Sequence, residues 1–256
     1  MVRNRLGWIC FAIIFYLLET HPALAGKLST EDPKTDAVMV SLQKRLKKVE
    51  ACSCKVVTVV HLMGQKFQIN GTAYFMVPGK MRIDKVLPGE TNQTVVSDGS
   101  TLWIYDSQEK VASRTNLGRV FEATGLEADA DQPDPTRPFR GLEWKQIRYM
   151  GTEVVDDVSY RVFEAKPQVT LLHAELPDVP KKARIFIHPK DGMMRSIHFI
   201  DASGEEVLSQ RFEEMVVNPK LDKSLFEFVI PSGVHIIDTT NEAIQILKGA
   251  SENGGP

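Results

Sequence analysis

The sequence predicts a mainly β protein, in which about eleven antiparallel strands form a half-open barrel covered by short helices. From Lys55 onward, apolar side chains recur at every second position, in short runs rich in β-branched and aromatic residues. Turn-forming pairs such as Pro78-Gly79 and Asp98-Gly99 separate these runs. Tight connections favour antiparallel pairing. A sheet of this size has to curl, and its inner face needs a cover.

One helix is expected before the strands. Between Val38 and Val49, apolar residues recur at every third or fourth position and form a single stripe, with Leu42 and Leu46 at its centre. Thr35 or Asp36 is expected to cap the first turn of this helix. The basic residues in its C-terminal half are expected to form a solvated face: Lys44, Arg45, Lys47 and Lys48.

The remaining elements follow from the same periodicities. Strands are predicted over residues 56–63, 67–76, 80–86, 94–97, 102–105, 110–113, 144–150, 158–165, 183–188, 194–200 and 206–216. A second short helix is predicted at 116–124, and 166–182 is a long connection. The acidic segment 127–138 is predicted to be a loop and not a calcium site, because it lacks the glycine and the distal glutamate of a calcium loop. Phe226 and Phe228 are expected to share one face of a late strand that ends at Pro231.

The first 25 residues have the pattern of an export signal. Arg3 and Arg5 precede the apolar run 6–18, and Ala23-Leu24-Ala25 supplies a signal-peptidase site. The apolar run is too short to span about 30 Å of hydrocarbon. We therefore expect cleavage after Ala25 and a periplasmic protein, with a signal peptide at 1–25, one domain at 26–240 and a flexible tail at 241–256.

Composition argues against several classes of function. The chain has 31 basic and 33 acidic residues, and loss of residues 1–25 leaves a net charge of about −3, which disfavours nucleic acid as a partner. The sequence contains no nucleotide-binding glycine motif, no zinc-protease motif and no nucleophile elbow, and its histidines are scattered. No catalytic or metal-binding residue is assigned, and an enzyme is the minority interpretation.

Cys52 and Cys54 remain after the expected cleavage. Two cysteines one residue apart on a strand point the same way, too far apart for an easy disulfide. No matching pair of cysteines or histidines indicates a metal site, so buried or idle thiols are favoured over a metal or redox role. Intermolecular pairing remains an alternative.

Three passages resemble the LolA-like family of periplasmic lipoprotein carriers. They are residues 71–84, which include Gly71 and Pro78; residues 96–106, which contain Ser-Asp-Gly-Ser-Thr-Leu-Trp-Ile-Tyr-Asp; and the ending 222–238, which contains Leu-Phe-Glu-Phe. With residues 192–201, the resemblance covers most of 35–240. It implies an unclosed barrel with a helical lid and an apolar cavity that receives lipoprotein acyl chains, without a cofactor. The family typically has an arginine before the proline at the position of Pro78, where it holds the lid closed. This chain has Val77 there.

Nine apolar residues on the expected strands and helices are the candidates for the cavity or its lid: Phe75, Met81, Ile83, Trp103, Tyr105, Phe121, Trp144, Phe163 and Phe199. Whether the interior is a packed core or a cavity is left open by the sequence. The resemblance implies a monomer that binds acylated lipoproteins or free lipid, between an inner-membrane donor complex and an outer-membrane acceptor. The alternatives are a lipoprotein-sensing regulatory module of the same fold and, less favoured, a hydrolase or metalloprotein.

Overall fold

The computed structural model describes residues 18–19, 30–62, 64–87, 91–127, 134–167 and 180–253. Of the expected signal peptide, only β1 (Leu18–Glu19) is described, and it pairs antiparallel with β8 (Leu126–Glu127). The rest of residues 1–25 lies outside the described residues, so the expected cleavage remains a prediction.

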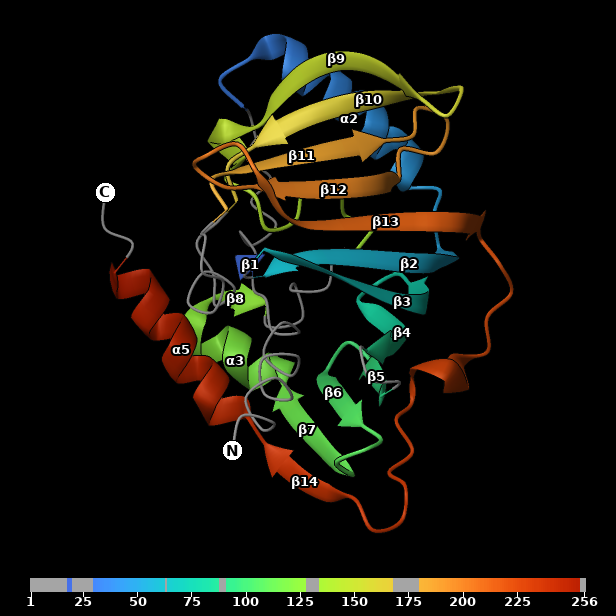
Figure 1. The fold of residues 1–256 in the computed structure, drawn as a ribbon, viewed down its shortest axis with the longest axis vertical. Coiled ribbons are helices and arrows are strands. Elements are labelled where there is room, and N and C mark those ends of the chain that lie inside the picture. The colour runs from blue at the N-terminus through green and yellow to red at the C-terminus, as the bar shows by residue number, and fades with distance from the viewer. Residues whose placement is uncertain are drawn as a thin grey trace.

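A single large sheet dominates the described residues, and its strands stack from one end of the molecule to the other (Figure 1). Its strand order is β14 (His235–Asp238), β7 (Val111–Asn116), β6 (Thr101–Asp106), β5 (Thr91–Ser97), β4 (Lys80–Leu87), β3 (Gln65–Met76), β2 (Ala51–Leu62), β13 (Glu206–Val217), β12 (Met194–Ile200), β11 (Lys182–Ile187), β10 (Val158–Ala165) and β9 (Arg148–Val155).

This sheet confirms the predicted mainly β fold with helical cover. It has twelve strands and stays open, because β14 and β9 end the order at opposite edges. Its neighbouring strands pair antiparallel except β14, which pairs parallel with β7. This parallel pair was not predicted, because β14 follows β13 in the sequence but lies at the far edge of the sheet, next to β7.

Three α-helices within the described ranges lie against the sheet. Figure 1 shows α2 (Pro33–Leu46) behind the strands β9–β12, with α3 (Leu117–Thr124) and α5 (Thr240–Asn253) side by side at the other end. Buried side chains of α2 and α5 belong to the same apolar core as alternate residues of the strands. We call the sheet surface that contributes to this core the inner face, and the opposite surface the outer face.

The helix ends follow from capping, and one predicted cap was wrong. The side chain of Asp32 accepts hydrogen bonds from the backbone N–H groups of Lys34 and Thr35, so α2 is capped by Asp32 and not by Thr35 or Asp36. The predicted second helix is confirmed as α3, which Asn116 caps. The predicted apolar stripe of α2 is also confirmed, with Leu42 fully buried.

The expected flexible tail differs from the structure, because residues 240–253 form α5. Ala243 and Leu247 are buried in the core, so the helix is held by its apolar side. Asp238 accepts a hydrogen bond from the backbone N–H of Thr240 and stabilises the start of the helix. Its pKa is held well below the usual value by the hydrogen bond from Arg114.

The strand predicted around Phe226 and Phe228 is also wrong. Residues Lys223–Phe226 form a short 3₁₀ helix, which begins where the Asp222 side chain accepts a hydrogen bond from the N–H of Ser224. The chain then covers the outer face: the ring of Phe228 lies 5.2 Å from that of Trp103 and 5.8 Å from that of Tyr105. Similarly, Trp144 starts a 3₁₀ turn (Trp144–Gln146) and not a strand, so that β9 begins only at Arg148.

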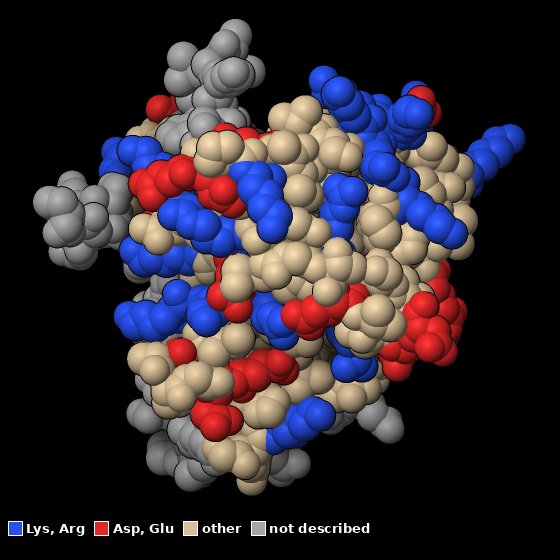
Figure 2. Space-filling view, turned by 90° about the horizontal axis from the view of Figure 1, so that it is seen from above, with Lys and Arg blue, Asp and Glu red and all other residues tan. Residues whose placement is uncertain are grey.

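The outer face of β9–β12 is polar. Arg184 pairs with Glu153, and Lys182 lies 3.4 Å from Glu164. Figure 2, which views the molecule from the β9 end, shows rows of acidic and basic side chains side by side, with further Lys and Arg side chains gathered at one edge. The inner face of this part of the sheet is apolar, whereas the outer face combines paired charges with the edge-to-face rings of Tyr160 and Phe186.

Candidate functional site

The candidate site is the apolar inner face, and four of the nine predicted residues lie on it. Phe75, Met81, Ile83 and Phe163 are each at most 4% exposed and belong to one core. Strand register explains why they meet: Phe75 stands directly opposite Met81 on β4, and alternate residues of neighbouring strands share a face.

Two more predicted residues, Trp144 and Phe199, are partly buried against the same core. Phe139, which was not predicted, packs on the same side, with its ring 4.9 Å from that of Phe163 and 6.2 Å from that of Trp144. Phe139 directly follows a segment predicted as a loop, so no periodicity marked it. The one sequence feature that could have indicated a buried Phe139 is its position directly after Pro138, where the polar segment ends.

The remaining three predicted residues lie elsewhere. Trp103 and Tyr105 are on the outer face under Phe228, because Leu102 and Ile104 take the inner positions of β6. Phe121 is 41% exposed on α3, whose buried residues are Leu117 and Val120. The structure therefore does not bring these three side chains to the inner face.

Cys52 and Cys54 both point to the inner face and are buried free thiols, as predicted. Burial raises the pKa of Cys54 to about 12 and raises that of Cys52 still further, so both remain protonated at neutral pH. They act as small apolar side chains of the core.

The inner face also carries polar side chains that were not predicted. Gln93, Ser97, Ser113 and Thr115 are buried on β5 and β7, in line with apolar neighbours such as Ile104. Strand alternation marks such positions as inward only once the register is known, which is why the sequence did not single them out.

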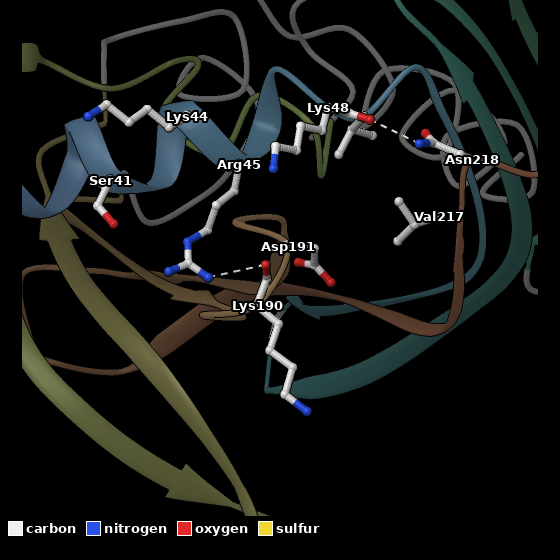
Figure 3. Close-up of a pocket in the computed structure, with 9 residues that line it drawn as sticks. Ser41, Lys44, Arg45, Lys48, Lys190, Asp191, Val217 and Asn218 are labelled. Carbon is white, nitrogen blue, oxygen red and sulfur yellow. Dashed lines mark hydrogen bonds between the residues drawn. The ribbon is translucent and has the colours of Figure 1, made fainter.

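A separate pocket of about 560 Å³ lies outside this core, between the C-terminal half of α2, the β11–β12 turn and the end of β13 (Figure 3). Its walls include the basic residues Lys44, Arg45 and Lys48. Arg45 donates a hydrogen bond to the carbonyl of Lys190, and Asn218 donates one to the carbonyl of Lys48. These bonds hold the C-terminal end of α2 to the sheet, and most of the residues that line the pocket are polar or charged.

Two kinds of site were not found among the described residues. No group of three or more His, Cys, Asp or Glu side chains lies close enough together to hold a metal ion. No helix in the same ranges is both long and apolar enough to cross a membrane.

Comparisons with known proteins indicate a family and a fold. The family model described as "Outer membrane lipoprotein carrier protein LolA" matches residues 58–128, which run from β2 to just beyond β8. Two proteins named outer-membrane lipoprotein carrier protein, from Histophilus somni strains 2336 and 129Pt, are each 26% identical over 200 residues. The alignment covers 77% of this chain and 85% of each relative.

Among solved structures, an uncharacterized conserved protein from Thermus thermophilus superposes with a TM-score of 0.53 at 9% identity. The match covers 80% of this chain and 99% of that protein. At this identity the likeness shows a shared fold.

Proposed function

We propose that this chain is a member of the LolA-like family and a periplasmic carrier that shelters acyl chains of lipoproteins, or of a related lipid, on its inner face. The observation that carries the proposal is the continuity of that face. Buried apolar side chains extend from Phe163 on β10 to Ile104 on β6, and residues of α2, α3 and α5 pack against them.

The energetics of an acyl chain explain why such a surface is needed. A chain of about fifteen buried methylenes gains roughly 12 kcal/mol on leaving water. A lipid-bearing molecule therefore cannot cross an aqueous compartment at a useful rate unless a carrier offers a comparable apolar surface. The sequence has no nucleotide-binding motif, so transfer would follow the relative affinities of donor, carrier and acceptor for the chain.

The location and partners belong to the same proposal. The export pattern of residues 1–25 and the names of the relatives support a periplasmic carrier. An inner-membrane donor complex and an outer-membrane acceptor would then be the partners. The helical cover, and not the rigid sheet, would have to move when a chain enters.

Native mass spectrometry tests the proposal. The protein is exported to a bacterial periplasm and purified without detergent, and its mass is measured before and after organic extraction. We expect acyl-lipid adducts that extraction removes and that reappear in the extract.

A matched pair of substitutions links the lipid to the inner face. Met81→Gln places an amide on that face, whereas Met150→Gln makes the same change at a residue of edge strand β9 that is 55% exposed. Met81→Gln should reduce lipid occupancy and Met150→Gln should not, with folding of both checked by circular dichroism. A wild-type protein that carries no lipid and takes up none from vesicles would refute the proposed function.

A further inference from the structure

A polar row borders the apolar inner face at one end of β4, β5 and β6. Lys85 stands directly opposite Gln93, and Gln93 stands directly opposite Asp106. Side chains of such cross-strand pairs share a face, with Cβ atoms about 5 Å apart. Two residues further along each strand, the same face is formed by Ile83, Val95 and Ile104, so an apolar surface and a polar row meet there.

Gln93 is the unusual member of this row. Its side chain is completely buried, yet neither Oε1 nor Nε2 has a hydrogen-bond partner within the described ranges. A buried carboxamide without partners opposes folding, and natural proteins retain very few such groups without a reason. A bound molecule that supplies the missing partner would be such a reason.

Its neighbour Asp106 does not supply that partner. The Oδ1 atom of Asp106 accepts hydrogen bonds from the backbone N–H groups of Gln108 and Glu109, at 2.8 and 2.9 Å. The carboxylate thus closes the turn between β6 and β7, where it has a structural role.

Lys85 has Gln93 on β5 as its cross-strand neighbour on one side and Gly71 on β3 on the other. A Cβ on Gly71 would lie 2.6 Å from the backbone oxygen of Asp84 and 3.3 Å from Cγ of Lys85, so the glycine leaves room for the lysine stem. Burial lowers the pKa of Lys85 to about 8, which leaves it mostly charged at neutral pH. It is nevertheless only half-buried by accessible area. Gln93, which stands directly opposite Lys85 on β5, therefore has a charged donor as its neighbour on the inner face.

We propose that Gln93 and Lys85 bind the oxygen atoms at the head of an acyl chain, a carboxylate or an ester carbonyl, while the hydrocarbon lies on the apolar inner face. Nε2 of Gln93 and Nζ of Lys85 are both donors, and both of these head groups offer oxygen acceptors. The inference rests on the proposed function and adds the chemistry that fixes the orientation of the chain.

A displacement assay tests the inference. A bound fluorescent fatty acid is displaced by one of three ligands of similar hydrocarbon length: palmitate, methyl palmitate or hexadecane. Gln93→Leu and Lys85→Met remove the donors and keep an apolar stem. The matched control is Gln68→Leu, because Gln68 lies on the outer face of β3 and its Nε2 donates to Asn70. Each inner substitution should weaken palmitate binding about tenfold, the effect of losing one good hydrogen bond to a charged group, and leave hexadecane binding unchanged.

The ligands also distinguish the two head groups. Weaker binding of palmitate alone in Lys85→Met would assign a free carboxylate, and equal weakening of methyl palmitate would assign an ester carbonyl. Unchanged palmitate affinity in both inner variants would overturn the inference and leave the proposed function standing. A wild-type protein that binds none of the three ligands would instead refute the proposed function itself.

Discussion

In both halves of the sheet, side chains alternate between the inner and the outer face, but the two inner faces differ in composition. On β10–β12, the inner face is apolar and close-packed under α2, with the aromatic ring of Phe163 in contact with those of Phe139 and Tyr149. On β4–β7, the inner face mixes apolar residues with buried polar ones, of which Gln93 and Ser113 have unpartnered atoms in the part of the chain that is described. The packed region fixes the helical cover, whereas the mixed region holds the polar groups that we propose meet the head of an acyl chain lying along the whole inner face.

The largest expected effect concerns the packed half. Phe163→Ala removes a fully buried ring and should lower the free energy of unfolding by about 3–5 kcal/mol, from lost burial and the cavity left behind. Phe121→Ala removes the same ring from a position that is 41% exposed, and its cost should stay below about 1 kcal/mol. Urea unfolding of both variants measures the contrast, and similar losses would contradict the packing assigned to β10.

The attachment of α2 gives the next largest effect. A Cβ on Gly192 would lie 2.9 Å from the carbonyl oxygen of Leu42, and its φ of +79° disfavours any other residue. Gly192→Ala should therefore cost about 2–3 kcal/mol, from backbone strain and the displacement of α2.

Gly204→Ala is the control for this substitution. Its φ is also positive, at +91°, but no atom lies within 4 Å of the added Cβ, so only the strain of about 1 kcal/mol is expected. Thermal unfolding of the two variants isolates the contact with α2. An equal cost in both would show that the close approach has no energetic role.

In the mixed half, a substitution should stabilise the protein. Gln93→Leu replaces an unpartnered buried carboxamide by an apolar side chain and should raise the free energy of unfolding of the lipid-free protein by about 1 kcal/mol. Gln68→Leu, on the exposed outer face, should change it by less than about 0.5 kcal/mol. Chemical denaturation of delipidated protein measures both, and a destabilised Gln93→Leu would mean that the amide is needed for the fold.

These regions also show what the sequence could predict. Alternation placed Met81 and Ile83 on the inner face of β4, because only one face of that strand is strongly apolar. On β6 both faces are apolar, and Trp103 and Tyr105 were predicted to face the interior because their rings are larger than the side chains that alternate with them. They lie outside because Phe228, distant in the sequence, covers them.

The same limit explains α5 and the polar row. Residues 241–256 were predicted to be a tail because the segment ends in Gly, Ser and Asn, yet burial of Ala243 and Leu247 depends on α3 and the sheet. Lys85, Gln93 and Asp106 become neighbours only through the register of three strands, which no single segment encodes.

The smallest expected effect is a pH dependence of stability in the β11–β12 turn. Burial, together with Arg195 and Lys190, lowers the pKa of His188 below its ordinary value, although Asp191 opposes them. The unfolded chain therefore binds a proton more readily than the folded one, and stability should fall as the pH drops below about 6.5.

His188→Gln should flatten this dependence between about pH 7 and pH 5.5. His235→Gln, at an exposed residue of β14, should leave it unchanged. Urea unfolding at the two pH values gives the comparison, and the same slope in wild type and His188→Gln would exclude this histidine as its source.

The central claim, that an acyl chain lies on the inner face, is tested most directly by tryptophan quenching. Trp144 packs against the inner core and Trp103 lies on the outer face under Phe228. In protein that lacks Trp8, by cleavage or by substitution with Phe, Trp103→Phe and Trp144→Phe each leave a single reporter. A doxyl-labelled fatty acid should quench Trp144 in a saturable manner and leave Trp103 bright. Quenching of Trp103 instead, or equal quenching of both, would contradict the claim.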